Sequence, residues 1–221
     1  MIKELNYTIM NKSILMVMAC LFCTIQAFAQ KDTQALAILD AMSEKYQKIP
    51  AFSANFSYIM ENESEGIDEK FEGKITVKSN MYKLEMSGQE IINDGSTIWT
   101  YLKDDNEVTI SEYDDSEEEI TLSNIFSIYK SGYKYLFLET KDNGKLDVVD
   151  LVPDDKDKTF YKIRMEIQNA DNELKNFRIF DKSGSRYLYK INQFAVNNTI
   201  KDSDFKFDEK KHPNVEIVDF R

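Results

Sequence analysis

The sequence has very little of the residues on which most enzymes and metal sites depend. Its 221 residues include one histidine, two cysteines, seven glycines and three prolines. A zinc site would need mostly carboxylate ligands, which is unusual for that metal. Glycine is too sparse for a phosphate-binding loop, and low Gly and Pro exclude a fibrous chain. We expect the only histidine, His212, to lie in a surface loop near Pro213.

Basic side chains are also in short supply. The chain carries 28 Lys and Arg against 39 Asp and Glu, a net charge of −11. This excess of acid argues against a nucleic-acid partner, because phosphate binding requires clustered positive charge. A hydrophobic content of 42% excludes a disordered chain. What the sequence does have is aromatic surface, with 14 Phe, 12 Tyr and one Trp.

Residues 1–29 are predicted to be a secretory signal peptide. Lys12 precedes an apolar run at 14–25, and Ala27-Phe28-Ala29 gives a cleavage site after Ala29. Twelve apolar residues are too few to span a bilayer, which takes roughly 20. Both cysteines, Cys20 and Cys23, lie in this segment. A faint lipobox ending at Cys20 is the alternative. Cleavage after Ala29 would leave 192 residues without cysteine and with a net charge of −12.

A helix is predicted next, over residues 33–48. Asp32 is positioned to cap its start, and Pro50 follows its end. Four apolar residues recur at helical spacing and define one buried face: Ala35, Leu39, Met42 and Tyr46.

Beyond Pro50 the hydrophobic period changes to two, which predicts strands with one buried and one solvated face. The alternation is clearest over residues 52–60, 71–77 and 82–86. Turn residues, most clearly Asn93-Asp94-Gly95, separate the strands. The remaining predicted strands are 97–102, 107–113, 133–140, 146–152, 159–168, 173–180 and 185–196.

A polar break at 114–119 interrupts the strands. Leu122, Ile125, Phe126 and Tyr129 then follow at helical spacing and predict a second short helix ending near Gly132. The predicted fold class is α+β and mainly antiparallel β, an incomplete half-barrel of about eleven strands closed by short helices. No Gly/Ser/Pro-rich linker divides the chain, so residues 30–221 are predicted to form a single domain.

Acidic residues gather in the predicted turns and leave two chemical alternatives open. A glycosidase needs two carboxylates across a cleft, and calcium needs six to eight oxygen ligands. The calcium-loop spacing of alternating Asp followed by Gly is absent, so we expect these acids to be solvated. We predict no cofactor, no metal and no catalytic residue. The acids in question are Asp104, Asp105, Asp114, Asp115, Glu117, Glu118, Glu119, Asp154, Asp155 and Asp157.

The aromatic and large aliphatic side chains have two possible structural roles. They fill an ordinary core, as in a small closed barrel, or they line a hydrophobic cavity inside a curled sheet. Periodicity does not separate the two.

Short motifs, in order along the chain, resemble those of the LolA family, periplasmic carriers of outer-membrane lipoproteins. IPAFSANF (residues 49–56) is similar to the start of that family, and EGKITVK (72–78) and YKLEM (82–86) to its second and third strands. The most specific match is DGSTIWTY (94–101), which is similar to the family segment D-G-x-x-x-W-x-Y. FKF (205–207) and the tail at 215–221 resemble the family's end.

The resemblance implies a monomeric carrier without nucleic acid that shelters acyl chains in an apolar interior. Its partners would be acylated lipoproteins, an inner-membrane lipoprotein-releasing ABC transporter and an outer-membrane acceptor. The implied cavity residues are Phe56, Tyr82, Leu84, Met86 and Trp99, and the implied lid residues are Leu122, Ile125, Phe126 and Tyr129. A non-transport module that binds or senses lipid in the envelope, on the same fold, is the alternative.

One position departs from the family pattern. Family members often carry Lys-Arg-Pro after the second strand, and that arginine helps hold the lid closed. Here Lys78 is followed by Ser79-Asn80, with no arginine. Closure of the lid by that arginine is therefore not predicted for this chain.

Overall fold

The computed structural model describes residues 32–114 and 120–221. The predicted signal peptide, its cleavage site after Ala29 and the acidic residues 115–119 lie outside these ranges. The described part contains one α-helix, α2 (Thr33–Gln47), and twelve strands. The strands are β1 (Ala51–Asn62), β2 (Ile67–Lys78), β3 (Met81–Met86), β4 (Gln89–Asn93), β5 (Thr97–Leu102), β6 (Glu107–Glu112), β7 (Tyr133–Lys141), β8 (Leu146–Pro153), β9 (Phe160–Gln168), β10 (Glu173–Asp181), β11 (Arg186–Val196) and β12 (Glu216–Asp219).

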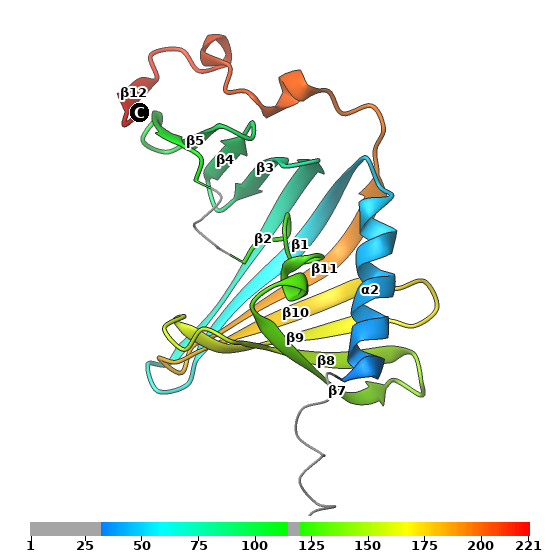
Figure 1. The fold of residues 1–221 in the computed structure, drawn as a ribbon. Helices are drawn as coiled ribbons and strands as arrows, with labels where there is room; N and C mark the ends of the chain where they lie inside the picture. The colour runs from blue at the N-terminus through cyan, green and yellow to red at the C-terminus, as the bar shows by residue number, and fades with distance from the viewer. Residues whose placement is uncertain (1–31, 115–119) are drawn as a thin grey trace, which may run out of the picture.

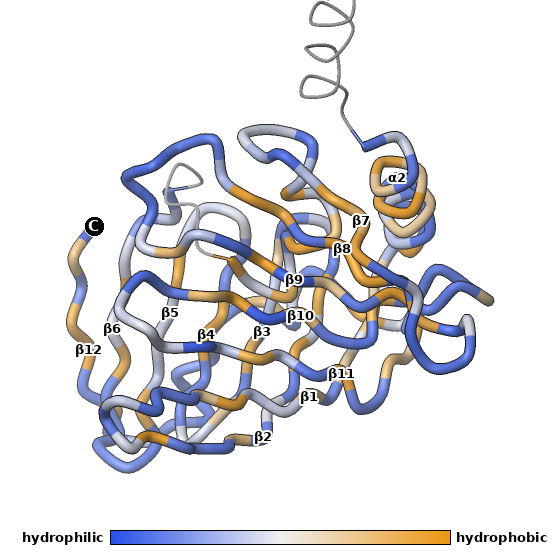
Figure 2. Tube along the Cα trace, turned by 90° about the horizontal axis from the view of Figure 1, so that it is seen from below, coloured by the Kyte–Doolittle hydropathy of each residue, from blue (hydrophilic) through white to orange (hydrophobic). Residues whose placement is uncertain are grey.

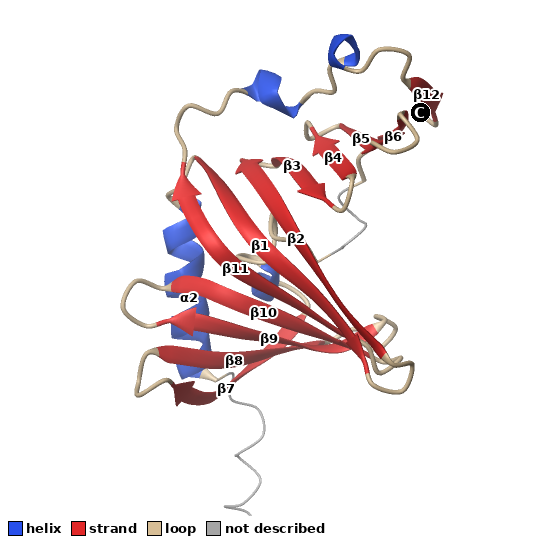
Figure 3. Ribbon diagram, turned by 180° about the vertical axis from the view of Figure 1, so that it is seen from behind, coloured by secondary structure: helices blue, strands red, loops and turns tan. Residues whose placement is uncertain are grey.

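The twelve strands form one curled sheet in the order β12-β6-β5-β4-β3-β2-β1-β11-β10-β9-β8-β7. Neighbouring strands are antiparallel except for β12, which pairs parallel to β6. The edge strands β12 and β7 do not pair, so the sheet stays an open half-barrel (Figures 1 and 3). The predicted fold class is confirmed. The parallel strand β12 was not predicted.

Helix α2 covers one side of the sheet, which we call the inner face (Figure 1). Its predicted apolar stripe is confirmed, because Ala35, Leu39, Met42 and Tyr46 are all buried. They pack against inward-facing side chains of β1, β2 and β7–β11. Figure 2 shows hydrophobic stretches on α2 and along β7 and β8, with hydrophilic residues at the hairpin turns. The main core therefore lies between α2 and the inner face.

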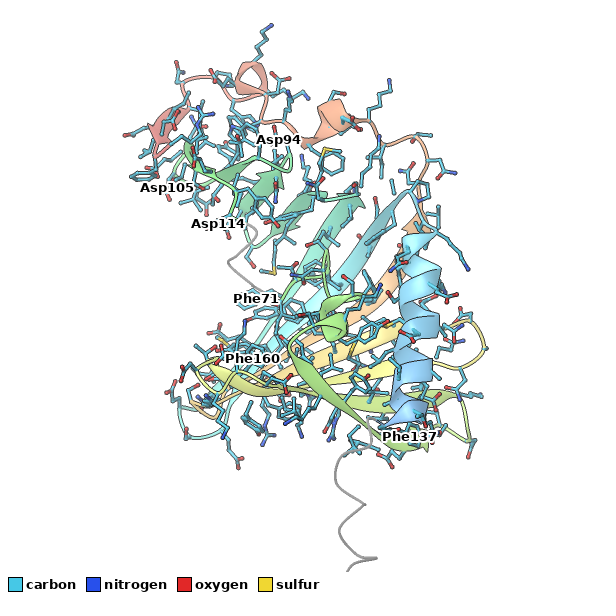
Figure 4. All side chains as sticks on the ribbon, in the orientation of Figure 1. Phe71, Asp94, Asp105, Asp114, Phe137 and Phe160 are labelled. Atoms are coloured by element: carbon cyan, nitrogen blue, oxygen red, sulfur yellow. The ribbon has the colours of Figure 1, made fainter. Side chains whose placement is uncertain are left out.

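Asp32 fixes the start of α2 to the edge of the sheet. Its Oδ1 accepts hydrogen bonds from the amides of Gln34 and Ala35, both at 3.0 Å. Its Oδ2 accepts a third from the amide of Phe137 on β7, at 2.8 Å, and Figure 4 shows Phe137 at the foot of the helix. These backbone donors, with that of Ala35 contributing most, lower the pKa of the Asp32 carboxyl.

Replacing Asp32 with Ala is expected to destabilise the protein by about 1–2 kcal/mol, because it removes an N-cap and a link to β7. Since the folded-state pKa is lowered, this stabilisation is present above the unfolded pKa of about 4. It is lost as the pH falls below that value. Urea denaturation at several pH values measures both effects. Asp32→Asn keeps one acceptor oxygen and should lose the acid sensitivity, so an unchanged acid profile in that variant would contradict the assignment.

The predicted second helix is wrong in form. Residues 122–127 form turns, and one turn of 3-10 helix, η2 (Ile128–Lys130), follows them. Polar side chains in this stretch bond the local backbone or each other, as when Asn124 Oδ1 accepts from the amide of Thr121 at 3.0 Å and Ser127 Oγ donates to Asn124 O at 3.3 Å. Such bonds compete with the α-helical pattern. The four apolar residues therefore have the sequence spacing of a helix but do not form an α-helix.

The C-terminal tail runs from the end of β11 past the ends of β1 and β2 to β12 (Figure 3). Its apolar side chains pack on the other side of the sheet, the outer face. It brings Ile200, Phe205 and Phe207 against Ile92 and Trp99 in a second, smaller core. Lys78 Nζ anchors the tail through Ile200 O at 3.1 Å and Asp202 Oδ1 at 2.7 Å.

The prediction that His212 lies in a surface loop is corrected in one respect. Its half-buried ring packs against Phe207, stacked at 4.7 Å between ring centroids, and against Tyr101 at 4.3 Å. The sequence did not predict the contact with Tyr101, because that residue is more than a hundred residues away. These ring contacts of His212 help to hold the tail against the sheet.

Candidate functional site

Strand register places most of the predicted cavity residues together on the inner face. Phe56 lies opposite Gly73, and Gly73 lies opposite Met86. Leu84 lies between Ile75 and Ile91 in the next row. Residues opposite each other in an antiparallel pair project from the same face. Phe56 and Met86 therefore share the face that α2 covers, and Leu84 and Tyr82 alternate onto it with Met86.

The inner face is unevenly covered along the sheet. On β1 and β2, Phe56, Ile75 and Val77 are 2–4% exposed. On β3 to β5 the inward-facing apolar side chains are only half-buried. We call this set the β3–β5 apolar surface, and it comprises Tyr82, Leu84, Met86, Ile91 and Ile98. It is one part of the inner face that offers contact area to another molecule, since Tyr58 of β1 and Tyr187 and Tyr189 of β11 are also only half-buried.

Trp99 does not belong to this surface. It lies opposite Ile92 on β4, so both residues project from the outer face, where they meet the tail. The residues of β4 and β5 that share the inner face with Tyr82, Leu84 and Met86 are Ile91 and Ile98 instead. The structure therefore brings Phe56, Tyr82, Leu84 and Met86 to one face and separates Trp99 from them.

The four predicted lid residues Leu122, Ile125, Phe126 and Tyr129 lie within the main core and are 0–7% exposed. Phe126 stacks on Tyr46 of α2 with ring centroids 3.7 Å apart, and it meets Phe52 of β1 edge-to-face at 5.9 Å. Residues 120–132, predicted to form a lid and called the lid segment below, are thus held against both α2 and the sheet by aromatic contacts.

A pocket of about 220 Å³ remains between the lid segment, the end of α2 and the start of β1. Its apolar wall includes Phe52, Val77 and Phe126, and its polar lining includes Ser79 and Ser127. Ser79 follows Lys78, at the position where the family pattern has an arginine. Here a small hydroxyl and an aromatic stack occupy that region of the lid.

Tyr129 supplies a polar contact between the lid segment and α2. Its hydroxyl donates to Asp40 Oδ1 at 2.6 Å, although the residue is only 3% exposed. Burial, with a further contribution from Asp40, raises the pKa of Tyr129 to about 12. The neutral, donating form is therefore strongly preferred in the folded protein.

Replacing Tyr129 with Phe is expected to cost about 1 kcal/mol at neutral pH, because it removes a hydrogen bond from a buried ring. Because the folded-state pKa is raised, the contribution of Tyr129 is present below its unfolded pKa of about 10. It is lost as the pH rises toward about 12. Urea denaturation between pH 7 and pH 11 measures this. Tyr161→Phe, which removes an exposed hydroxyl from β9, should leave stability at neutral pH unchanged, and equal losses in both variants would refute the contact.

Sequence reasoning missed Ile91, Ile98 and Asn93 on the inner face. Ile91 and Ile92 are adjacent, so alternation alone does not say which of them faces inward. The signal was available in the turn at Asp94-Gly95, because a hairpin register counted outward from it pairs Asn93 with Ile98 and Ile92 with Trp99.

The acidic turns do not assemble into a metal centre among residues 32–114 and 120–221, where no cluster of three His, Cys, Asp or Glu side chains is placed to hold an ion. Figure 4 shows Asp94, Asp105 and Asp114 around the β4–β6 end of the sheet, away from Phe71 and Phe160 in the body. Likewise, none of the helices in the described part of the chain is long and apolar enough to cross a bilayer.

Comparison with known structures relates the fold to several bacterial proteins. An uncharacterised conserved protein from Thermus thermophilus shares 14% identity, covering 84% of this chain and 99% of its own, with a TM-score of 0.55. A LolA-superfamily protein from Nitrosomonas europaea gives 13% identity over 78% and 97%, with a TM-score of 0.44. The Mycobacterium tuberculosis lipoprotein LppX gives 14% over 75% and 100%, with a TM-score of 0.48.

A search of curated proteins finds none that matches this sequence. The sequence profile of the family described as outer membrane lipoprotein carrier protein LolA matches residues 47–208, which run from the end of α2 through β11 to just beyond Phe207 of the tail. This match covers more than two thirds of the chain and includes the whole β3–β5 apolar surface. The chain therefore belongs to the LolA family.

Proposed function

We propose that this protein is a periplasmic carrier that binds the acyl chains of lipoproteins and moves them from the inner to the outer membrane. The observation that carries the proposal is the β3–β5 apolar surface. Five large apolar side chains stand half-buried on the inner face of a chain of the LolA family. In an ordinary core they would be covered as completely as Ile75 and Val77.

The energetics favour an acyl ligand for such a surface. Each CH₂ group removed from water contributes about 0.8 kcal/mol, so even part of one acyl chain supplies several kcal/mol. A carrier must also release its cargo. The lid segment is attached largely by separable side-chain contacts, such as the Phe126–Tyr46 stack and the Tyr129–Asp40 hydrogen bond. Loosening these contacts would let the lid segment move over bound chains.

We propose a binding role rather than an enzymatic one. On β3, β4 and β5 the acidic side chains Glu85 and Glu90 lie opposite each other, on the outer face. The inward-facing residues of these three strands include no carboxylate. A hydrolase with paired acids would need them beside the β3–β5 apolar surface, where the inward-facing side chains are apolar, amide or hydroxyl instead.

A transfer assay distinguishes a carrier from a lipid-sensing module on the same fold. Inner-membrane vesicles containing an acylated lipoprotein and its releasing ABC transporter are incubated with the protein, and outer-membrane vesicles are added as acceptor. A carrier forms a water-soluble complex with the lipoprotein and then delivers it to the acceptor. Binding without delivery would favour the sensing alternative, and failure to form the complex would contradict the proposal.

A further inference from the structure

One polar group on the inner face has an unmet hydrogen-bonding requirement. The side chain of Asn93, at the end of β4, is 0% exposed, and within the described residues its Nδ2 finds no acceptor. Buried amide groups are nearly always hydrogen-bonded, and one left unpaired is costly. This group therefore needs an explanation within the fold or in a ligand.

The orientation of the amide is fixed by the turn that follows it. Asn93 Oδ1 accepts a hydrogen bond from the backbone amide of Gly95 at 2.6 Å. Exchanging the oxygen and nitrogen would place two donors against each other, so the nitrogen must be the unpaired atom. The free group of Asn93 is thus its N–H donor, and a ligand that bonds to it must supply a hydrogen-bond acceptor.

Asn93 sits at one end of the β3–β5 apolar surface. It lies opposite Tyr82 on β3 and opposite Ile98 on β5, and directly opposed side chains have Cβ atoms about 4.5–5.5 Å apart. Both neighbours are half-buried. Because Asn93 is fully buried, the side chains that cover it must shift before an acyl chain between Tyr82 and Ile98 comes against its amide. The tail of that chain would then run along Leu84 toward Met86.

We propose that Asn93 is a specificity residue that donates a hydrogen bond to the ester carbonyl of a bound acyl chain. The inference rests on the proposed acyl binding and adds the polar chemistry of the ligand. An ester carbonyl accepts without donating and carries no charge. A free fatty acid would also bring an acceptor, but its carboxylate would find no Lys or Arg among the inward-facing residues of β3–β5, where Lys83 faces outward opposite Ile92.

The test compares two probes that differ only in the carbonyl, 1-monopalmitoylglycerol and 1-O-hexadecylglycerol, by displacement of a fluorescent lipid. The wild-type protein should bind the ester about tenfold more tightly than the ether, the effect of one buried hydrogen bond. Asn93→Leu should bind the ester and the ether equally. Asn55→Leu on the outer face, where the exposed Asn55 bonds Gln193, is the control and should keep the preference.

A spectroscopic measurement on the wild-type protein does not depend on a variant that folds. The stretching frequency of a ¹³C-labelled ester carbonyl should fall on binding, as expected for a carbonyl that accepts a hydrogen bond. Equal wild-type affinity for ester and ether, or an ester preference that survives in Asn93→Leu, would overturn the inference while leaving acyl binding intact. If neither probe binds, the proposed function itself fails.

Discussion

Replacing Leu84 with Glu is expected to reduce acyl-chain binding by at least about 100-fold. Leu84 occupies the middle of the β3–β5 apolar surface, flanked by Ile75 and Ile91 on the neighbouring strands. A carboxylate there must either leave water when a chain binds, at a cost of several kcal/mol, or hold the chain away. Because every 1.4 kcal/mol is a factor of ten in affinity, two such factors are a conservative expectation. Displacement of a fluorescent fatty probe measures the change.

A matched control exists on the opposite side of the sheet. Leu136 on β7 is 53% exposed and lies opposite Asp150 on the outer face. Leu136→Glu makes the same chemical change without touching the inner face, and it should bind the probe as the wild type does. If Leu84→Glu and Leu136→Glu bind alike, with both proteins folded, the β3–β5 apolar surface is not the acyl site.

Adding a single methyl group at Gly73 is expected to destabilise the protein by about 2–3 kcal/mol. A Cβ at this position would lie 2.5 Å from Phe56 Cζ and 2.8 Å from Cε1. Phe56 cannot easily yield, because Tyr189 packs beside it and itself stacks on Phe177 at 4.6 Å. Overpacking of this kind typically costs about 1–3 kcal/mol. Urea denaturation of Gly73→Ala measures the loss.

The shorter side chain in Phe56→Leu should remove the conflict. In that background, Gly73→Ala is expected to be neutral or slightly stabilising, since glycine weakens a strand interior. The double-mutant cycle should therefore show a coupling of about 2 kcal/mol between the two sites. Additive effects would mean that the Phe56 ring does not occupy the space above Gly73.

The parts of the fold that the sequence predicted best are those governed by periodicity and turn chemistry. The stripe from Ala35 to Tyr46 identified the buried side of α2 because it repeats over about three turns. The Asn93-Asp94-Gly95 signal identified the β4–β5 hairpin, where Gly95 adopts φ +92°. Both patterns act over a few neighbouring residues, so they need no knowledge of the rest of the chain.

The misses arose where polar bonds compete with the apolar period or where distant residues decide the outcome. The spacing of Leu122 to Tyr129 is that of a helix, yet Thr121, Asn124 and Ser127 take part in local polar bonds that favour turns. Trp99 has the aromatic character of a cavity residue, but its register with Ile92 turns it toward a tail that begins almost a hundred residues later. Tail contacts of this range leave no local trace in the sequence.

Mass spectrometry of the protein purified from its own cell envelope tests the central claim most directly. The account predicts that the wild-type protein and Leu136→Glu carry acylated lipoprotein at about one molecule per chain, while Leu84→Glu carries little or none. Alkaline hydrolysis of the same samples should release ester-linked acyl chains only from the first two. A wild-type protein that never retains acylated lipoprotein, even when supplied with it, would contradict the account.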